Sequence, residues 1–227
     1  ATPMATSLKY LPINIHDRQV LGPRVAMMPD KALHRSAPRL APGKLGRSAQ
    51  TRPEEGMKKA LLLIDLQNDY FPGGKFPLWN TDAVLTNIEQ AIKTARARDI
   101  PIIHIQHIAN LEMGIAPFFN KGTDGAKIHP RVLAAAPDAP IVVKAYADGF
   151  VGTKLEETLS ALGVDELLVC GMMTQNCVTH TAISKSAEKY KVSILPDCCT
   201  TVDEMLHNIA LHAVSTRVSL IPAGDAI

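Results

Sequence analysis

The sequence predicts an α/β fold of the three-layer, doubly wound (Rossmann-like) type, with a six-stranded parallel sheet. Two observations support this: short apolar runs alternate with amphipathic segments from residue 58 onward, and several runs lack the polar alternation of a strand with one exposed face. With 46% hydrophobic residues, the 227-residue chain is long enough to bury a full core. We expect one domain at 57–227, preceded by an extension at 1–56.

The first three elements form a βαβ unit. Lys58–Ile64 is an apolar run that ends at Asp65, and Thr81–Asp99 has apolar residues on one face and polar residues on the other. Pro101–His107 is the second predicted strand, and the spacing fits a right-handed crossover between parallel strands. Residues 108–140 look like a long loop rich in glycine and proline, of the kind that shapes specificity.

The later elements continue the alternation of strand and helix. Ile141–Val143 is a short strand, a helix at Thr153–Leu162 follows, and Gly163 stops that helix. The remaining predicted elements are the strands Leu167–Cys170, Lys191–Leu195 and Arg217–Ile221 and the last helix, Asp203–Val214. No Gly-x-Gly-x-x-Gly follows the first strand, so a dinucleotide site has no support.

Gly171 ends the central strand, and a helix capped by Thr174 or Asn176 is expected next. Cys177 then falls in the first turn, where unpaired N–H groups and the helix dipole favour a thiolate. Cys177 is therefore a candidate nucleophile. The alternative is a small core residue, which is the interpretation we prefer for Cys170.

Composition excludes several classes. The chain has no run of about 18 apolar residues, which argues against a membrane span. Its four cysteines lie in the last third and form no Cys-x-x-Cys pair, as expected for reduced thiols of a cytoplasmic protein rather than a disulfide or zinc framework. Residues 57–227 carry a net charge of −3, which argues against a nucleic-acid surface.

The extension at 1–56 differs from the rest of the chain. It has nine Lys/Arg against four Asp/Glu (9 − 4 = +5), seven prolines and no sustained period, so we expect a flexible segment. Its basic, acid-poor composition also fits an organellar targeting segment. Because Met57 directly precedes the first strand and is a candidate start, a natural upstream or vector-derived extension is the preferred interpretation.

Three chemically useful side chains each follow a different predicted strand. Asp65, Lys144 and Cys177 should therefore meet at the carboxyl edge of the sheet. A carboxylate can take the thiol proton, and an ammonium stabilises both the carboxylate and the thiolate. The alternative for Asp65 is capping of its own loop, a role for which Asp69 is the better candidate.

Three segments carry a resemblance to a known superfamily. Asp65-Leu66-Gln67-Asn68-Asp69, Lys144 with Phe150 six residues later, and Gly171-Met172-Met173-Thr174-Gln175-Asn176-Cys177-Val178 resemble the signature segments of the isochorismatase-like cysteine hydrolases. The resemblance runs from about Lys58 to Leu220, and all three segments occur in the right order. It implies a catalytic triad of Asp65, Lys144 and Cys177 that attacks an amide-type carbon and forms a thioester.

The resemblance also implies a cis peptide bond at Met172–Met173, with the N–H groups of Met173 and Cys177 as the oxyanion hole. A small-molecule substrate and a homo-oligomer, dimeric or larger, are expected on the same grounds. The candidate pocket residues are Gln67, Tyr70, Phe71, His107, Phe150 and Thr174.

Nicotinamidases of the superfamily have an Asp-x-His cluster and a further histidine after the first segment, whereas this chain has Lys75–Asn80 in the corresponding region. We therefore expect no metal, no cofactor and no nicotinamidase activity. Members that cleave isochorismate act on a vinyl ether and do not need the cysteine, so Cys177 favours cleavage of a carbon–nitrogen bond. Three alternatives remain: an isochorismatase-type vinyl ether hydrolase, a redox protein using Cys177 or the Cys198–Cys199 pair, and a non-catalytic oligomer on the same scaffold.

Overall fold

A single six-stranded sheet forms the centre of the protein. The computed structural model describes residues 56–110 and 114–227. Every strand pairing is parallel, and the strand order is β3-β2-β1-β4-β5-β6. The strands are β1 (Lys59–Ile64), β2 (Ile102–His107), β3 (Ile141–Lys144), β4 (Glu166–Met172), β5 (Lys191–Thr200) and β6 (Ser219–Leu220). The predicted doubly wound α/β fold is confirmed.

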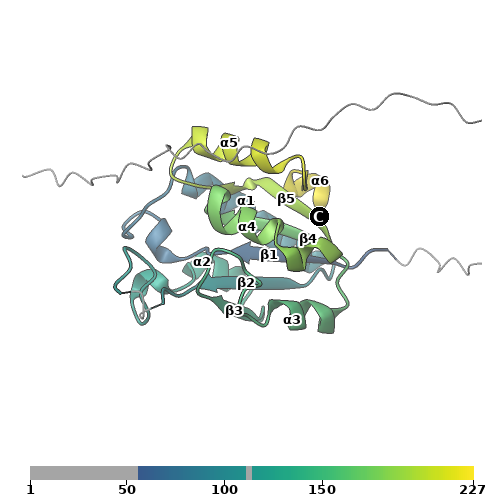
Figure 1. Ribbon diagram of the computed structural model, residues 1–227, viewed down its shortest axis with the longest axis horizontal. Helices are drawn as coiled ribbons and strands as arrows, with labels where there is room; N and C mark the ends of the chain where they lie inside the picture. Colours follow the sequence, from purple (N-terminus) through teal and green to yellow (C-terminus); the bar gives the residue numbers. More distant parts are fainter. Residues whose placement is uncertain (1–55, 111–113) are drawn as a thin grey trace, which may run out of the picture. The chain divides into compact units, whose positions relative to one another are not determined.

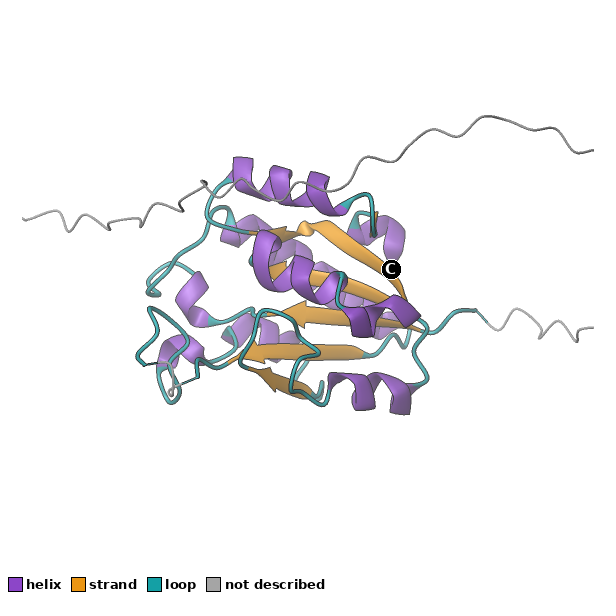
Figure 2. Cartoon of the chain, in the orientation of Figure 1, coloured by secondary structure: helices purple, strands orange, loops and turns teal. Residues whose placement is uncertain are grey.

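Helices cover both faces of the sheet (Figure 1). They are α1 (Thr81–Ala97), α2 (Pro130–Ala135), α3 (Leu155–Leu162), α4 (Thr179–Ala182), α5 (Glu204–Val214) and α6 (Ala223–Ala226). In Figure 2, α4 passes in front of the strands and α1 lies behind them, which gives three layers. Asp203 caps α5 by accepting a hydrogen bond from the Leu206 N–H at 2.8 Å.

The two central strands are buried on both sides. Every residue of β4 is buried, and in β1 only Lys59 is partly exposed. The side chains from Leu61 to Ile64 are at most 1% exposed, and full burial of a leucine or isoleucine contributes about 1.5–3 kcal/mol. This burial explains why these strands have no polar alternation in the sequence.

The carboxyl ends of β1 and β4 define the place where a ligand can bind. β1 has β2 on one side and β4 on the other, so the chain leaves these two strands in opposite directions. In open α/β sheets, ligands bind at the strand ends where this reversal occurs. Gly171 is required here because its φ is +122° and a Cβ atom would lie 2.1 Å from the Ile64 carbonyl oxygen. Asp65 and the turn that carries Cys177 lie on the two sides of this switch point.

Some elements differ from the sequence prediction. Residues 108–140 are not wholly loop, because they contain a 3₁₀ turn at Asp124–Ala126 and helix α2. β5 continues through Pro196 to Thr200, five residues beyond its predicted end. The pairing steps from Val169↔Ile194 to Gly171↔Cys199, so extra residues of β5 bulge out and Pro196 fits without an N–H to donate.

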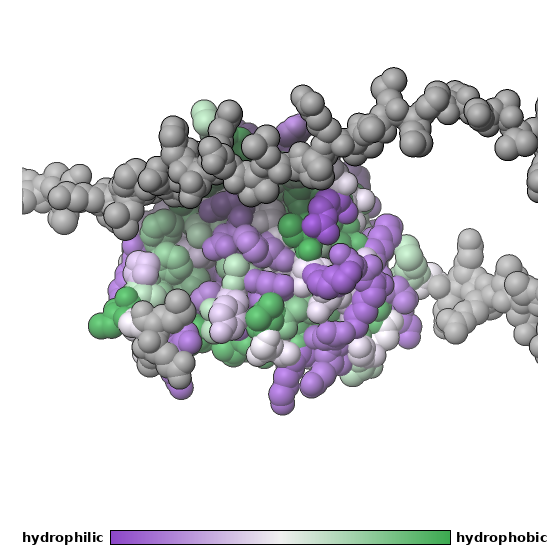
Figure 3. Space-filling view, in the orientation of Figure 1, coloured by the Kyte–Doolittle hydropathy of each residue, from purple (hydrophilic) through white to green (hydrophobic). Residues whose placement is uncertain are grey.

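The surface is mixed. In the view of Figure 3, hydrophilic residues cover much of the described part and hydrophobic residues form small groups between them. The most exposed large apolar side chains include Met205 (74%) and Ile209 (58%) on α5, and Ile141 and Val143 on edge strand β3. No helix of the described residues is long and apolar enough to cross a membrane. The predicted homo-oligomer stays a prediction.

The predicted extension at 1–56 falls almost wholly outside the described residues, which begin at Gly56. Its flexibility and its boundary with the domain therefore stay predictions.

Candidate active site

Lys144 is the centre of a buried polar cluster. It is the last residue of β3, and its side chain has no exposed surface. Its Nζ lies 2.8 Å from Asp65 Oδ2 and 3.2 Å from Cys177 Sγ. The same nitrogen lies 3.0 Å from His107 Nδ1 and 3.1 Å from the Tyr146 carbonyl oxygen. The three residues that were predicted to meet at this edge are therefore in contact around one ammonium group.

Asp65 is held in a strained backbone conformation directly after β1. Its φ of +50° lies in the left-handed region, which costs a non-glycine residue about 1 kcal/mol or more. The Asp65 N–H donates to the Ile105 carbonyl at 2.9 Å, and its carbonyl accepts from the Gln67 N–H at 2.8 Å. Its Oδ1 is buried and has no hydrogen-bond partner among the described residues. This oxygen is available to accept a proton.

Cys177 lies in a π-helical turn, Thr174–Val178, that follows β4. The residue is 2% exposed, and burial raises the pKa of its thiol. The carboxylate of Asp65 raises this pKa further, whereas the ammonium of Lys144 opposes both effects. Burial therefore opposes the thiolate that the backbone position was expected to favour. A base close to the sulfur is needed to take the thiol proton.

Lys144 itself is charged. Burial lowers the pKa of its ammonium, but Asp65 and Cys177 together raise it by more, so the net shift is upward. An ammonium offers three N–H donors and no acceptor, yet four acceptors surround Nζ. At most three of these four contacts can therefore be hydrogen bonds at one time.

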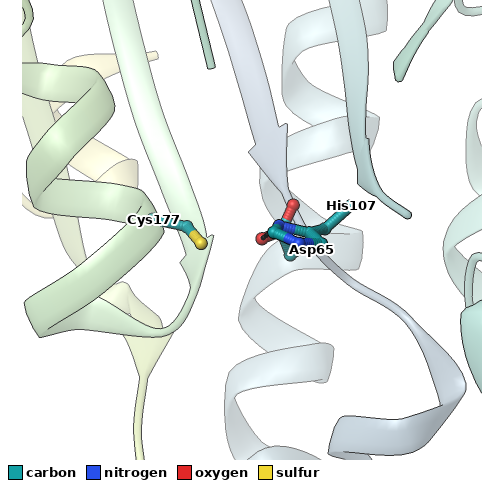
Figure 4. Close-up of side chains that lie close together, drawn as sticks. All are labelled: Asp65, His107 and Cys177. Atoms are coloured by element: carbon teal, nitrogen blue, oxygen red, sulfur yellow. Dashed lines mark ion pairs between the residues drawn. The ribbon is translucent and has the colours of Figure 1, made fainter. Parts of the chain in front are cut away.

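His107 joins this cluster from the end of β2. Its Nδ1 lies 4.0 Å from Asp65 Oδ2 as well as 3.0 Å from Lys144 Nζ, and its side chain is 22% exposed. Burial and then the Lys144 ammonium lower the pKa of the imidazole. Figure 4 shows Asp65 and His107 close together, with the Cys177 side chain pointing toward them from the other side. His107 is thus a neutral group at the accessible side of the site.

Gln67 holds the backbone of His107. Its Oε1 accepts from the His107 N–H at 2.8 Å, and its Nε2 donates to the carbonyls of His107 and Ala126, each at 2.8 Å. Gln67 is fully buried, and both of its amide protons are used. We predicted Gln67 as a pocket residue, but its amide has no donor left for a substrate and instead supports the end of β2.

Tyr70 is the one other predicted pocket residue that the structure ties to the cluster. Burial raises the pKa of the Tyr70 hydroxyl, and the Asp65 carboxylate raises it further. Its ring packs edge-on against Phe119, with centroids 4.5 Å apart. Tyr70 and Phe119 are at most 1% exposed and form an apolar wall near the site.

The remaining predicted pocket residues have other partners. Phe71 packs against His129 at 4.2 Å between centroids, and Phe150 stacks on Tyr190 at 6.5 Å. Thr174 is fully buried, and its hydroxyl is 2.9 Å from Nδ1 of His207. The roles of Phe71, Phe150 and Thr174 in the pocket stay predictions.

Two contributors to the site have little or no sequence signal. Tyr146 acts through its backbone carbonyl, which any residue could supply. His207 supports the Cys177 turn through Thr174, and its one signal is that it lies on the buried face of an amphipathic helix. Asp69 has the loop-capping role that was predicted, because its carboxylate accepts from the Phe119 N–H at 2.8 Å and the Lys75 N–H at 3.2 Å.

The donor atoms of Asp65, His107 and Cys177 lie within 4.8 Å of one another and could by geometry bind a metal ion. The Lys144 ammonium, however, is 3.2 Å or less from one atom of each of them. A divalent cation would have to displace this ammonium and overcome its charge. The donor set therefore fits the lysine better than a metal.

The region that contains this cluster matches a known protein family. The isochorismatase domain model matches residues 59–221, which is most of the chain and includes Asp65, His107, Lys144 and Cys177. The chain belongs to the isochorismatase family. Named relatives in this family include hydrolases, such as a maleamate amidohydrolase and nicotinamidases.

Individual relatives cover the same region. An uncharacterized isochorismatase family protein, YddQ of Bacillus subtilis, is 38% identical over 171 residues, which are 75% of this chain and 93% of YddQ. The maleamate amidohydrolase of Pseudomonas putida is 30% identical over 63% of this chain and 72% of its own length. A crystal structure of an isochorismatase-like hydrolase from Alkaliphilus metalliredigens superposes with a TM-score of 0.68 at 27% identity, over 75% of this chain and 95% of that one.

Proposed function

We propose that this protein is a cysteine-dependent hydrolase that cleaves a carbon–nitrogen bond of a small amide, ureide or lactam through a thioester. The observation that carries this proposal is the position of Lys144 Nζ, which contacts both Asp65 and Cys177 inside a buried cluster. The unpartnered Oδ1 of Asp65 supplies the base that a protonated thiol requires. The 30% identity to a maleamate amidohydrolase supports the same bond type.

In the first half-reaction, Asp65 takes the proton from the Cys177 thiol and the sulfur attacks the carbonyl carbon. A carbon–sulfur bond forms, and the π electrons of the carbonyl move to its oxygen. When the intermediate collapses, the carbon–nitrogen bond breaks, and the leaving nitrogen takes the proton that Asp65 holds. Ammonia or an amine leaves, and a thioester on Cys177 remains.

In the second half-reaction, Asp65 takes a proton from water, and the resulting hydroxide attacks the thioester carbon. A carbon–oxygen bond forms, the carbon–sulfur bond breaks, and the sulfur regains the proton that Asp65 took from water. The acid product then leaves. Lys144 stabilises the anionic sulfur and the carboxylate in turn, because its ammonium contacts both. The net reaction is amide plus water to acid plus ammonia.

The oxyanion formed in both halves needs donors. We assign this role to the backbone N–H groups of Met173 and Cys177, which lie in the segment after β4. The peptide bond between Met172 and Met173 is cis. Loss of one such donor typically reduces the rate by about 100-fold or more.

A substrate screen tests the proposal. Purified protein is incubated with amides, ureides and lactams, and released ammonia or amine is measured; isochorismate, with detection of pyruvate, represents the vinyl ether alternative. We expect nitrogen release that is lost in Cys177→Ala. Pyruvate release that survives Cys177→Ala would favour the vinyl ether reaction instead, since that reaction does not need a thiol.

A further inference from the structure

His107 has a feature that the proposed reaction does not use. Its Nδ1 faces the Lys144 ammonium at 3.0 Å, and that ammonium can only donate. Nδ1 must therefore carry the lone pair, which leaves the single imidazole proton on Nε2. The lowered pKa of the imidazole agrees with a ring that stays neutral beside a cation.

The Nε2–H of this tautomer has no acceptor within the described part of the chain, as none of the hydrogen bonds there involves it. Asp65 and Lys144 have fully buried side chains, whereas the His107 side chain is 22% exposed. Because Nδ1 faces the buried lysine, the side of the ring with Nε2 is the part turned toward solvent. A donor without an acceptor among the described residues therefore lies on the solvent side of the cluster.

The ring is also fixed in place. The Gln67 side-chain amide forms hydrogen bonds with both the backbone N–H and the backbone carbonyl of His107, at 2.8 Å each. The ring centroids of Phe119 and His107 are 5.9 Å apart. The backbone N–H of Phe119 donates a hydrogen bond to the Asp69 carboxylate, which fixes the position of Phe119. Such support is what a recognition group requires, since a donor that is already oriented loses little entropy on binding.

We propose that His107 is a substrate-recognition residue, whose Nε2–H donates a hydrogen bond to an acceptor atom of the substrate close to the scissile carbonyl. The inference rests on the proposed function, because it takes the carbonyl to be the group that Cys177 attacks. Neutral imidazole holds its proton too tightly to act as a general acid, so the role is binding and orientation. The substrate would then have a hydrogen-bond acceptor atom next to the reacting carbonyl group.

The test uses aldehydes, which add reversibly to a thiol. The sulfur bonds to the aldehyde carbon, and the thiol proton moves to the aldehyde oxygen. Because the aldehyde takes the place of the substrate carbonyl, the test does not require the substrate to be known. Benzaldehyde is compared with the three pyridine carbaldehydes, which have the same shape and one acceptor nitrogen each. Binding is measured as protection of Cys177 from alkylation by iodoacetamide, followed by peptide mass spectrometry.

We expect at least one pyridine carbaldehyde to protect wild-type Cys177 better than benzaldehyde does. In His107→Phe this preference should shrink by about 5- to 10-fold, the effect of one neutral hydrogen bond. His107→Gln, which keeps an N–H donor, should restore part of it, and His212→Gln on the exposed side of α5 is the control without effect. The quantity compared between variants is the ratio of protection by a pyridine carbaldehyde to protection by benzaldehyde. The intrinsic difference in aldehyde reactivity is the same in each variant and cancels.

An independent readout is the ¹⁵N NMR spectrum of the His107 ring, which distinguishes the two tautomers without any ligand. We expect Nε2–H in the wild type and loss of this preference in Lys144→Met. A protonated ring or an Nδ1–H tautomer at neutral pH overturns the inference, as does an unchanged aldehyde preference in His107→Phe. If Cys177 is neither alkylated nor protected by any aldehyde, the proposed function fails instead.

Discussion

The ammonium nitrogen of Lys144 lies 3.2 Å from the sulfur of Cys177, although the two residues follow different strands and are 33 positions apart. Two unit charges at this distance attract by about 5 kcal/mol at an effective dielectric constant of about 20. Burial raises the free energy of the Cys177 thiolate, and the attraction to Lys144 lowers it. Formation of the thiolate at Cys177 therefore depends on Lys144. The same ammonium also contacts Asp65, which links the base to the nucleophile.

Lys144→Met tests this link. We expect the variant to lose rapid alkylation of Cys177, and its free energy of unfolding to fall by about 3–5 kcal/mol because Asp65 is left buried without its partner. Urea unfolding and iodoacetamide labelling measure the two effects separately. Adding Asp65→Asn should recover part of the stability but none of the reactivity, and labelling of Lys144→Met at the wild-type rate would contradict the account.

The sequence allows the fold and the cluster to be predicted for one physical reason. Parallel strands place their carboxyl ends together, so Asp65, Lys144 and Cys177 could be assigned to one edge without knowing any distance. The role of Gln67 could not be predicted, because a buried amide that binds backbone has the same sequence as one that faces a ligand. The same limit applies to the carbonyl of Tyr146.

Segment boundaries were less predictable where pairing overrides local preference. Proline usually ends a strand, yet Pro196 lies inside β5 because a bulge frees it from donating. The two helical turns, Asp124–Ala126 and Thr174–Val178, and the short helices α2 and α4 have too few residues for a periodic pattern. The upward shift of the Cys177 pKa could not be predicted either, because it depends on burial, which the sequence does not give.

Stability should fall in mild acid. Burial lowers the pKa of His104 in the folded protein, and His107 and His207 shift in the same direction. Below the unfolded value of about 6.5, the unfolded chain binds these protons while the folded chain does not, so stability is present above that pH and is lost as the pH falls.

His104 is the variant of choice for this test because it lies in β2, where its Nε2 is 3.0 Å from the Ala136 carbonyl. His104→Gln keeps a donor but does not titrate. Urea unfolding at pH 7.5 and pH 5.5 should show a smaller acid loss in His104→Gln than in the wild type. Equal losses in both proteins would mean that His104 does not contribute.

Removal of metal should have no effect. The Lys144 ammonium occupies the centre of the group formed by Asp65, His107 and Cys177, so dialysis against a chelator should leave both hydrolysis and Cys177 labelling unchanged. Elemental analysis before and after dialysis provides the control. Activity that disappears and returns with zinc or iron would show that a metal displaces the lysine.

Truncation before Met57 should leave the catalytic domain folded and active, because β1 begins at Lys59 and the predicted extension lacks core periodicity. Melting temperature and size-exclusion profile of the full and shortened chains measure the effect. A drop of more than about 8 °C corresponds to roughly 2 kcal/mol or more for a domain of this size, and would refute the boundary at Met57.

Cys177→Ser tests the central claim most directly. On any amide that the wild type hydrolyses, we expect ammonia release by the variant to fall by more than about 1000-fold, since a serine hydroxyl is far harder to deprotonate than a thiol. Cys198→Ala, which removes a buried thiol of β5 outside the cluster, should retain activity and serves as the matched control. Near-native ammonia release from a folded Cys177→Ser would contradict the account, because the reaction would then not pass through a thioester on Cys177.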